Sequence, residues 1–133
     1  MTGSPRDKTY VKVVPDKGRA VFANKRLRKG DEIECSPVLV FTVQTTEMAP
    51  FSYEYAWDDE DDVEHREWWI GLGHTSLYNH SHEPNADYEL IDDDVDGPRI
   101  RIVALRRIAA DEEIMIDYTG DGEPWPLKNW PGL

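Results

Sequence analysis

Apolar residues occur along the chain in short blocks, and no segment keeps a helical period for three turns. Residues 10–14 have the β-branched content of a strand, and this block ends at Pro15, in a turn-forming segment that closes with Gly18. Residues 19–23 resume the extended pattern. The pattern therefore predicts a β-hairpin early in a chain that is mostly β.

Further strands are predicted later in the chain. Residues 36–43 form one candidate, and residues 99–105 form a second, in which apolar and charged side chains alternate. Ile114, Ile116 and Tyr118 alternate in the same way with polar neighbours, which predicts a third strand.

The connections between these strands are strongly polar. Residues 58–64 and 92–98 are acidic runs with turn-forming composition, and we interpret both as solvated loops rather than metal sites. Short helical turns are predicted near residues 47–55 and 74–78.

One local turn-and-strand motif occurs twice in the sequence. Residues 27–33 and 108–114 align without gaps, and each consists of an apolar anchor, a charged turn and the start of a strand. Gly30 in the first copy can adopt a positive φ without strain, and Asp111 at the matching place is one of the few other residue types that tolerate it. Two copies of a turn do not make a repeat protein, so we interpret them as one device used twice.

Acidic residues dominate the charge. The chain has 27 Asp and Glu against 15 Lys and Arg, a formal net charge of −12. Phosphate backbones are repelled by such a charge, so direct nucleic-acid binding is disfavoured. A lysine-rich protein would be attracted instead, at rates that fall with salt, although plain solubility explains the charge equally well.

Length and composition favour one intracellular domain. The 133 residues fit a single core, and the longest apolar run, residues 37–41, is too short to span a bilayer. The lone Cys35 has no cysteine partner in the chain, which suits a reducing compartment. We expect a protein without a signal peptide or membrane span, cytoplasmic, or nuclear in a eukaryotic or viral setting, and compatible with a homodimer.

The densest polar cluster lies at residues 74–85, and three interpretations compete for it. A metal site would use His74, His80, His82 and Glu83, but their spacing matches no familiar ligand pattern. A phosphate loop at residues 71–73 lacks the third glycine and the lysine of such motifs. A polar loop that hydrogen-bonds its own backbone is the plainest alternative.

A family resemblance decides between them. Asn79, His80, Ser81, Pro84 and Asn85 resemble the Asn-His-Ser-x-x-Pro-Asn motif of SET-domain methyltransferases. Further matches follow in the family's order and bring the resemblance to residues 11–118: residues 17–23, residues 27–33, Tyr55, residues 104–108 and residues 112–118. Because each short motif alone is weak, the order of the matches carries the resemblance. The short bacterial and viral members are similar in size and spacing.

The resemblance implies both a fold and a division of the chain. The implied fold is mostly β, with several small sheets, short helical turns and a C-terminal pseudoknot in which the last segment threads a loop. Residues 1–9 would be a flexible N-terminus, residues 10–118 the catalytic domain, and residues 119–133 a flap over the cofactor and substrate, without zinc-binding cysteines.

The activity implied is that of a protein-lysine N-methyltransferase that uses S-adenosylmethionine, needs no metal and acts on a basic, lysine-rich protein. Tyr118 would stand at the point of transfer, and Tyr55 would line an aromatic channel for the lysine stem. Cofactor contacts carried over from the family fall on Lys17, Gly18, Arg19, Ala20, Asn79, His80, Tyr118 and Trp125. The family contact of His80 is largely through its main chain, and for Trp125 adenine contact and ordinary packing are equally open.

Three departures from the family pattern stand out. Ala20 replaces a glycine beside the cofactor, Asp111 replaces a glycine in the last turn, and His82 replaces the cysteine of many eukaryotic members. No cysteine triad follows Tyr118.

A binding module is the chief alternative to an enzyme. A non-catalytic SET relative, or a reader of methylated lysine, would use aromatic side chains as a cage, and the candidates are Tyr53, Tyr55, Trp57, Trp68 and Trp69. Retention of Tyr118 and Asn79 favours catalysis.

Overall fold

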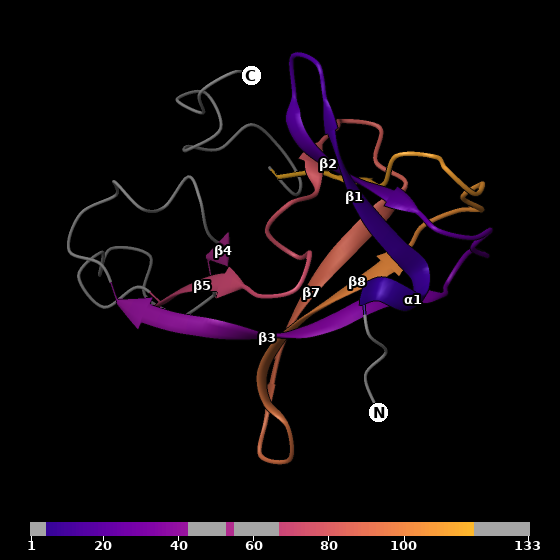
Figure 1. Cartoon of the computed structure of the whole chain (residues 1–133). Coiled ribbons are helices and arrows are strands. Elements are labelled where there is room, and N and C mark those ends of the chain that lie inside the picture. The colour runs from indigo at the N-terminus through magenta and orange to yellow at the C-terminus, as the bar shows by residue number, and fades with distance from the viewer. Residues whose placement is uncertain (1–4, 43–52, 55–66, 119–133) are drawn as a thin grey trace.

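The computed structural model describes residues 5–42, 53–54 and 67–118 (Figure 1). These residues form nine strands and one short helix, α1 (Pro5–Lys8). None of them belongs to a helix with the length and apolarity needed to cross a bilayer. The mostly-β architecture predicted from the pattern is confirmed.

The predicted hairpin is present. β1 (Thr9–Val14) pairs antiparallel with β2 (Gly18–Ala23), and the turn between them uses positive φ values at Asp16 (71°) and Gly18 (77°). Ala20 keeps the regular register opposite Lys12, and its methyl group is fully buried. The residue that replaces the family glycine therefore contributes to the core without disturbing the strand.

The main sheet has the order β4-β5-β3-β8-β7, with every neighbour antiparallel. Its strands are β3 (Glu32–Thr42), β4 (Tyr53–Glu54), β5 (Glu67–Gly71), β7 (Ala86–Asp93) and β8 (Gly97–Ala104). The long strand β3 holds the sheet together, because its first half pairs with β8 and its second half with β5 (Figure 1). The acidic turn between β7 and β8 lies where the sequence predicts a loop. β3 begins earlier than predicted, since Glu32 already pairs with Val103.

A third, very small sheet joins distant parts of the chain. β6 (Asn79–His80) and β9 (Met115–Ile116) pair in parallel. β9 is shorter than the strand predicted from the alternation at residues 114–118. The segment before β6 is a series of turns rather than a helix: the Thr75 N–H donates to the Leu72 carbonyl and the Leu77 N–H to the His74 carbonyl. Residues 47–52, residue 55 and the acidic run 58–64 lie outside the described residues.

The two copies of the turn device pair with each other. Leu27 and Ile108 exchange both backbone hydrogen bonds, at 2.8 and 3.0 Å. The Gly30 N–H donates to the carbonyl of Ala104, which stands four residues before Ile108. In the matching way, the Asp111 N–H donates to Ala23, four residues before Leu27, and both bonds measure 2.8 Å. The two segments are thus related by a local pseudo-twofold axis.

The positive φ values expected in both turns are confirmed, at 88° for Gly30 and 67° for Asp111. Glycine takes this conformation freely, and an aspartate is among the few residue types that tolerate it. The Asp111 carboxylate also accepts a hydrogen bond from the Tyr10 hydroxyl at 2.8 Å, which ties this turn to β1.

One core runs beneath the hairpin, the main sheet and the paired turns. It is built from aliphatic residues and two aromatic ones, and its members are Val21, Ala23, Leu27, Ile33, Trp69, Tyr78, Ala86, Ile100, Ile102, Ala104, Ile108, Ile114 and Ile116. Gly71 borders this core, and a Cβ atom there would lie 1.9 Å from Thr75 Oγ1. Packing against Thr75 and Ile100 therefore leaves no room for a side chain at Gly71, which gives this glycine a structural role.

Candidate active site

The motif residues Asn79 and His80 meet the C-terminal segment at the parallel pair of β6 and β9. Asn79 stands opposite Met115, His80 stands opposite Ile116, and the pairing continues as the Ser81 N–H donates to Ile116 at 2.9 Å. On its other side the same C-terminal segment contacts β2, where Ile114 donates to Val21 at 2.8 Å. The last described segment therefore lies between the hairpin and β6, a placement consistent with the implied pseudoknot.

Tyr118 follows this pair and is held at two points. Its hydroxyl donates to the main-chain oxygen of Tyr78 (2.5 Å), and its backbone N–H donates to His80 Nδ1 (3.0 Å). Burial raises the pKa of Tyr118 to about 12, and the negative charge of Glu113 acts in the same direction. The phenol is therefore neutral at physiological pH and presents a fixed hydroxyl.

His80 acts as a hydrogen-bond acceptor in this arrangement. Because its Nδ1 receives the N–H of Tyr118, the neutral ring carries its proton on Nε2, which lies 3.3 Å from His82 Nε2. Burial lowers the pKa of His80, the neighbouring His82 lowers it further, and Asp117 opposes the shift. The side chain is thus a neutral structural support for Tyr118.

A metal at this place conflicts with that tautomer. Among the described residues, His80, His82 and Asp117 bring possible ligand atoms within 4.8 Å of one another. Neither ring nitrogen of His80 has a free lone pair, however, since Nδ1 accepts a hydrogen bond and Nε2 carries the proton. His74, expected in the metal alternative, is engaged elsewhere, with Nδ1 2.8 Å from Thr9 Oγ1.

Three of the residues expected to bind the cofactor lie close to one another and to Glu113, namely Lys17, Arg19 and Asn79. The Asn79 amide donates to Glu113 Oε2 (2.9 Å) and to the Arg19 carbonyl (3.2 Å), while Lys17 Nζ lies 3.1 Å from Glu113 Oε1. Gly18 leaves the backbone open here, because nothing lies within 4 Å of the place that a Cβ atom would take. The structure thus brings Lys17, Gly18, Arg19 and Asn79 to one surface.

Glu113 belongs to the C-terminal motif but is absent from the predicted site residues. It pairs with Phe22 of β2 across an isolated bridge, which is a contact between distant segments. Its place in the motif is the one sequence signal that could have identified it.

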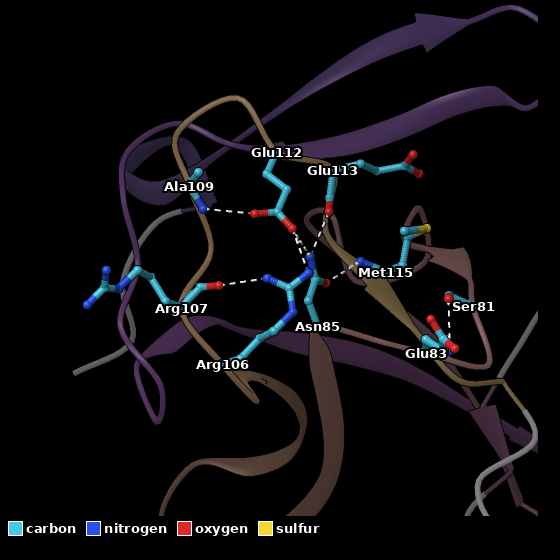
Figure 2. Close-up of polar contacts among 9 residues, drawn as sticks. All are labelled: Ser81, Glu83, Asn85, Arg106, Arg107, Ala109, Glu112, Glu113 and Met115. Carbon is cyan, nitrogen blue, oxygen red and sulfur yellow. Dashed lines mark hydrogen bonds and ion pairs between the residues drawn. The ribbon is translucent and has the colours of Figure 1, made fainter.

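Asn85 fixes the path of the C-terminal segment. Figure 2 shows its amide between Glu112, Glu113 and Met115. The nitrogen donates to the Glu113 carbonyl (2.8 Å) and to Glu112 Oε2 (3.3 Å), and the oxygen accepts the Met115 N–H at 2.8 Å. Asn85 is fully buried, so no water replaces these partners, and it sets the position of β9 and hence of Tyr118.

Three of the residues named from the sequence lie outside the residues that the structure describes: Tyr55, Trp125 and, from the aromatic-cage alternative, Trp57. Trp69 is fully buried in the core and offers no aromatic face to a ligand, so its place in a cage is wrong.

Comparison with known families agrees with this geometry. The model of the SET domain matches residues 18–119, which include the hairpin strand β2, the Asn79 motif and Tyr118. The chain belongs to the SET-domain family. SET methyltransferases transfer the methyl group of S-adenosylmethionine, and the predicted class, a protein-lysine methyltransferase, is confirmed with the family.

Known SET proteins extend the likeness. The histone-lysine N-methyltransferase of Schizosaccharomyces pombe described as specific for histone H3 lysine-37 is 31% identical over 107 residues, which are 77% of this chain and 67% of that protein.

Solved structures share the fold. A candidate histone methyltransferase of Plasmodium falciparum superposes with a TM-score of 0.68 at 26% identity, over 89% of this chain and 96% of that one. The structure of ATXR5 in complex with histone H3.1 gives a TM-score of 0.69 at 16% identity, over 90% of this SET protein but only 60% of the other chain. The SET fold predicted from the motifs is confirmed.

Proposed function

We propose that this SET protein methylates a lysine of a basic protein at the junction of β6, β9 and Tyr118. The observation that carries the proposal is the convergence of two motifs: the Asn79 amide and the Tyr118 hydroxyl come from distant segments and are fixed by the parallel pair. S-adenosylmethionine, when bound, supplies an electrophilic methyl group on its sulfonium.

The protein's task in this chemistry is positioning. Lysine has an ordinary pKa of about 10.4, so its ammonium would have to give up a proton to solvent before the neutral amine could act as the nucleophile. A neutral Tyr118 hydroxyl, kept in place by the Tyr78 carbonyl, orients the reacting groups without changing their charge. Tyr55 is proposed as the aromatic channel wall and Trp125 as a cover for the cofactor.

The charges around Glu113 suit the amino-acid end of the cofactor. That end carries an ammonium and a carboxylate, and the ion pair of Glu113 with Lys17 offers the opposite charge to each. The Asn79 amide adds donors and an acceptor, and the backbone of Gly18, Arg19, Ala20 and His80 supplies the remaining proposed contacts.

Cofactor binding gives the direct test. Saturating S-adenosylmethionine or its demethylated product should raise the melting temperature by several degrees, because a ligand present at 100 times its Kd stabilises the folded state by about 2.7 kcal/mol. Asn79→Ala should lose most of this shift. Glu83→Ala, an exposed change in the same loop, serves as the matched control. A wild-type protein with no shift at saturation would contradict the cofactor assignment.

The substrate is proposed to be a basic protein, and the histone-directed relative from Schizosaccharomyces pombe supports this class. With a net charge of −12, the domain should capture a lysine-rich peptide faster at low ionic strength. We expect kcat/KM to fall several-fold as the Debye length shortens from about 30 Å at 0.01 M to about 8 Å at 0.15 M salt, with kcat nearly unchanged. A peptide of zero net charge with one lysine is the control. If kcat/KM falls equally with salt for both peptides, the charge of the domain does not speed substrate capture. Such a substrate would place the enzyme inside the cell, in the nucleus where the target is chromatin.

A further inference from the structure

The Glu34 carboxylate has no part in the contacts described so far, although it is almost completely buried in β3, with 1% exposure. It accepts three hydrogen bonds: from the Tyr78 hydroxyl to Oε1 (2.6 Å), from Ser36 Oγ to Oε2 (2.7 Å) and from the His74 backbone N–H to Oε2 (3.1 Å). A buried carboxylate is costly unless donors surround it, so these bonds hold their donors firmly.

A local irregularity accompanies the burial of Glu34. The pairing of β3 with β8 changes register between Glu32 and Glu34, and the four residues from Ile33 to Ser36 are all buried, so both faces of this part of the strand are covered. Within this covered part, the Glu34 carboxylate meets the hydroxyl of Tyr78.

Tyr78 links this carboxylate to the candidate active site. Its hydroxyl donates to Glu34, and its main-chain oxygen accepts the hydroxyl of Tyr118. The residue is 1% exposed and belongs to the core. Its ring and its carbonyl are therefore anchored together, and the acceptor of the Tyr118 hydroxyl is fixed from the far side of the residue.

We propose that Glu34 is a positioning residue for methyl transfer, which fixes the Tyr78 carbonyl through the Tyr78 hydroxyl and so orients the hydroxyl of Tyr118. This inference rests on the proposed role of Tyr118. Glu34 moves no proton to the site, because the ring and main chain of Tyr78 are joined only by carbon–carbon bonds. It acts through geometry, where a displacement of about 1 Å can cost up to a hundred-fold in rate.

The chain offers a matched pair of variants for the test. Tyr78→Phe keeps the ring and removes the bond to Glu34, while Ser36→Ala removes a different bond to the same carboxylate and leaves Tyr78 untouched. Both should lower the melting temperature by similar amounts. We expect kcat to fall at least five-fold in Tyr78→Phe and to stay within two-fold of wild type in Ser36→Ala, with cofactor affinity unchanged in both. Glu34→Met keeps the length of the side chain but removes both acceptor oxygens, so its turnover should resemble that of Tyr78→Phe, and it provides the test if Tyr78→Phe does not fold.

A second readout does not depend on activity. The backbone amide of Asn79 follows the Tyr78 carbonyl, so its NMR resonance reports on the hydrogen bond that this carbonyl accepts. Tyr118→Phe defines the resonance without that bond, and Tyr78→Phe should move the Asn79 amide in the same direction, whereas Ser36→Ala should not.

These measurements distinguish a failure of the proposed methyltransferase function from a failure of the proposed role of Glu34. Wild-type protein that transfers no methyl group and binds no cofactor would refute the proposed function, while the Asn79 amide would still show whether Glu34 controls the Tyr118 contact. If Tyr78→Phe retains the turnover of Ser36→Ala and leaves the Asn79 resonance in place, Glu34 is a structural residue alone and the inference is overturned.

Discussion

Replacing Tyr118 with phenylalanine should lower kcat at least ten-fold, a barrier increase of about 1.4 kcal/mol, with the fold and the cofactor affinity nearly intact. The substitution removes the hydroxyl that donates to the Tyr78 carbonyl but keeps the aromatic ring, which packs against the core. Turnover at saturating peptide and cofactor is the quantity to measure.

Tyr10→Phe is the natural control for this change. It also removes one phenolic hydrogen bond, to Asp111, at a turn outside the β6 and β9 junction. Its kcat should match that of wild type. Equal turnover in the Tyr118 and Tyr10 variants would remove the Tyr118 hydroxyl from the mechanism.

Asn85→Ala should cause the largest loss of stability among the single changes considered, roughly 2 to 4 kcal/mol in the free energy of unfolding. Removal of the amide leaves the Met115 N–H and the Glu113 carbonyl without the partner that each has in the buried interior. Because β9 then loses its anchor, we also expect activity to fall at temperatures well below the unfolding midpoint.

Chemical denaturation should compare the free energy of unfolding of Asn85→Ala with that of Glu83→Ala, a substitution two residues away in the same loop. Glu83 is exposed, so its substitution should change the free energy of unfolding by less than about 0.5 kcal/mol. A loss of that small size in Asn85→Ala as well would show that β9 is held by its other contacts.

Local patterns were sufficient to predict the hairpin and both positive-φ turns. β-branched residues, a proline and a glycine predict β1 and β2 from neighbours a few positions apart. Gly30 and Asp111 are of residue types that tolerate the positive φ of their turns. The order of the motifs also predicted which segments form the candidate site, and the structure brings Lys17, Arg19 and Asn79 close together.

Long-range contacts account for what the sequence did not reveal. β7 was not predicted, although Ala86, Tyr88 and Leu90 alternate with acidic residues as in a half-buried strand, and its pairing with β8 is what identifies it. The contacts of Glu34, Tyr78 and Glu113 are made with residues far away in the sequence, so local patterns could not predict them. Trp69 is a further example, because the sequence alone did not show that this candidate for an aromatic cage is buried in the core.

The pseudo-twofold pairing of the two turns has a consequence for how the molecule is made. Leu27 and Ile108 are separated by more than half of the chain, so the entropy of closing a long loop must be overcome before either turn gains its partner. During translation the backbone groups of the early copy would hydrogen-bond to water until the late copy has emerged from the ribosome. Methyltransferase activity should therefore appear in one late step of biosynthesis, and refolding from denaturant should restore the Tyr118 environment together with the core rather than after it.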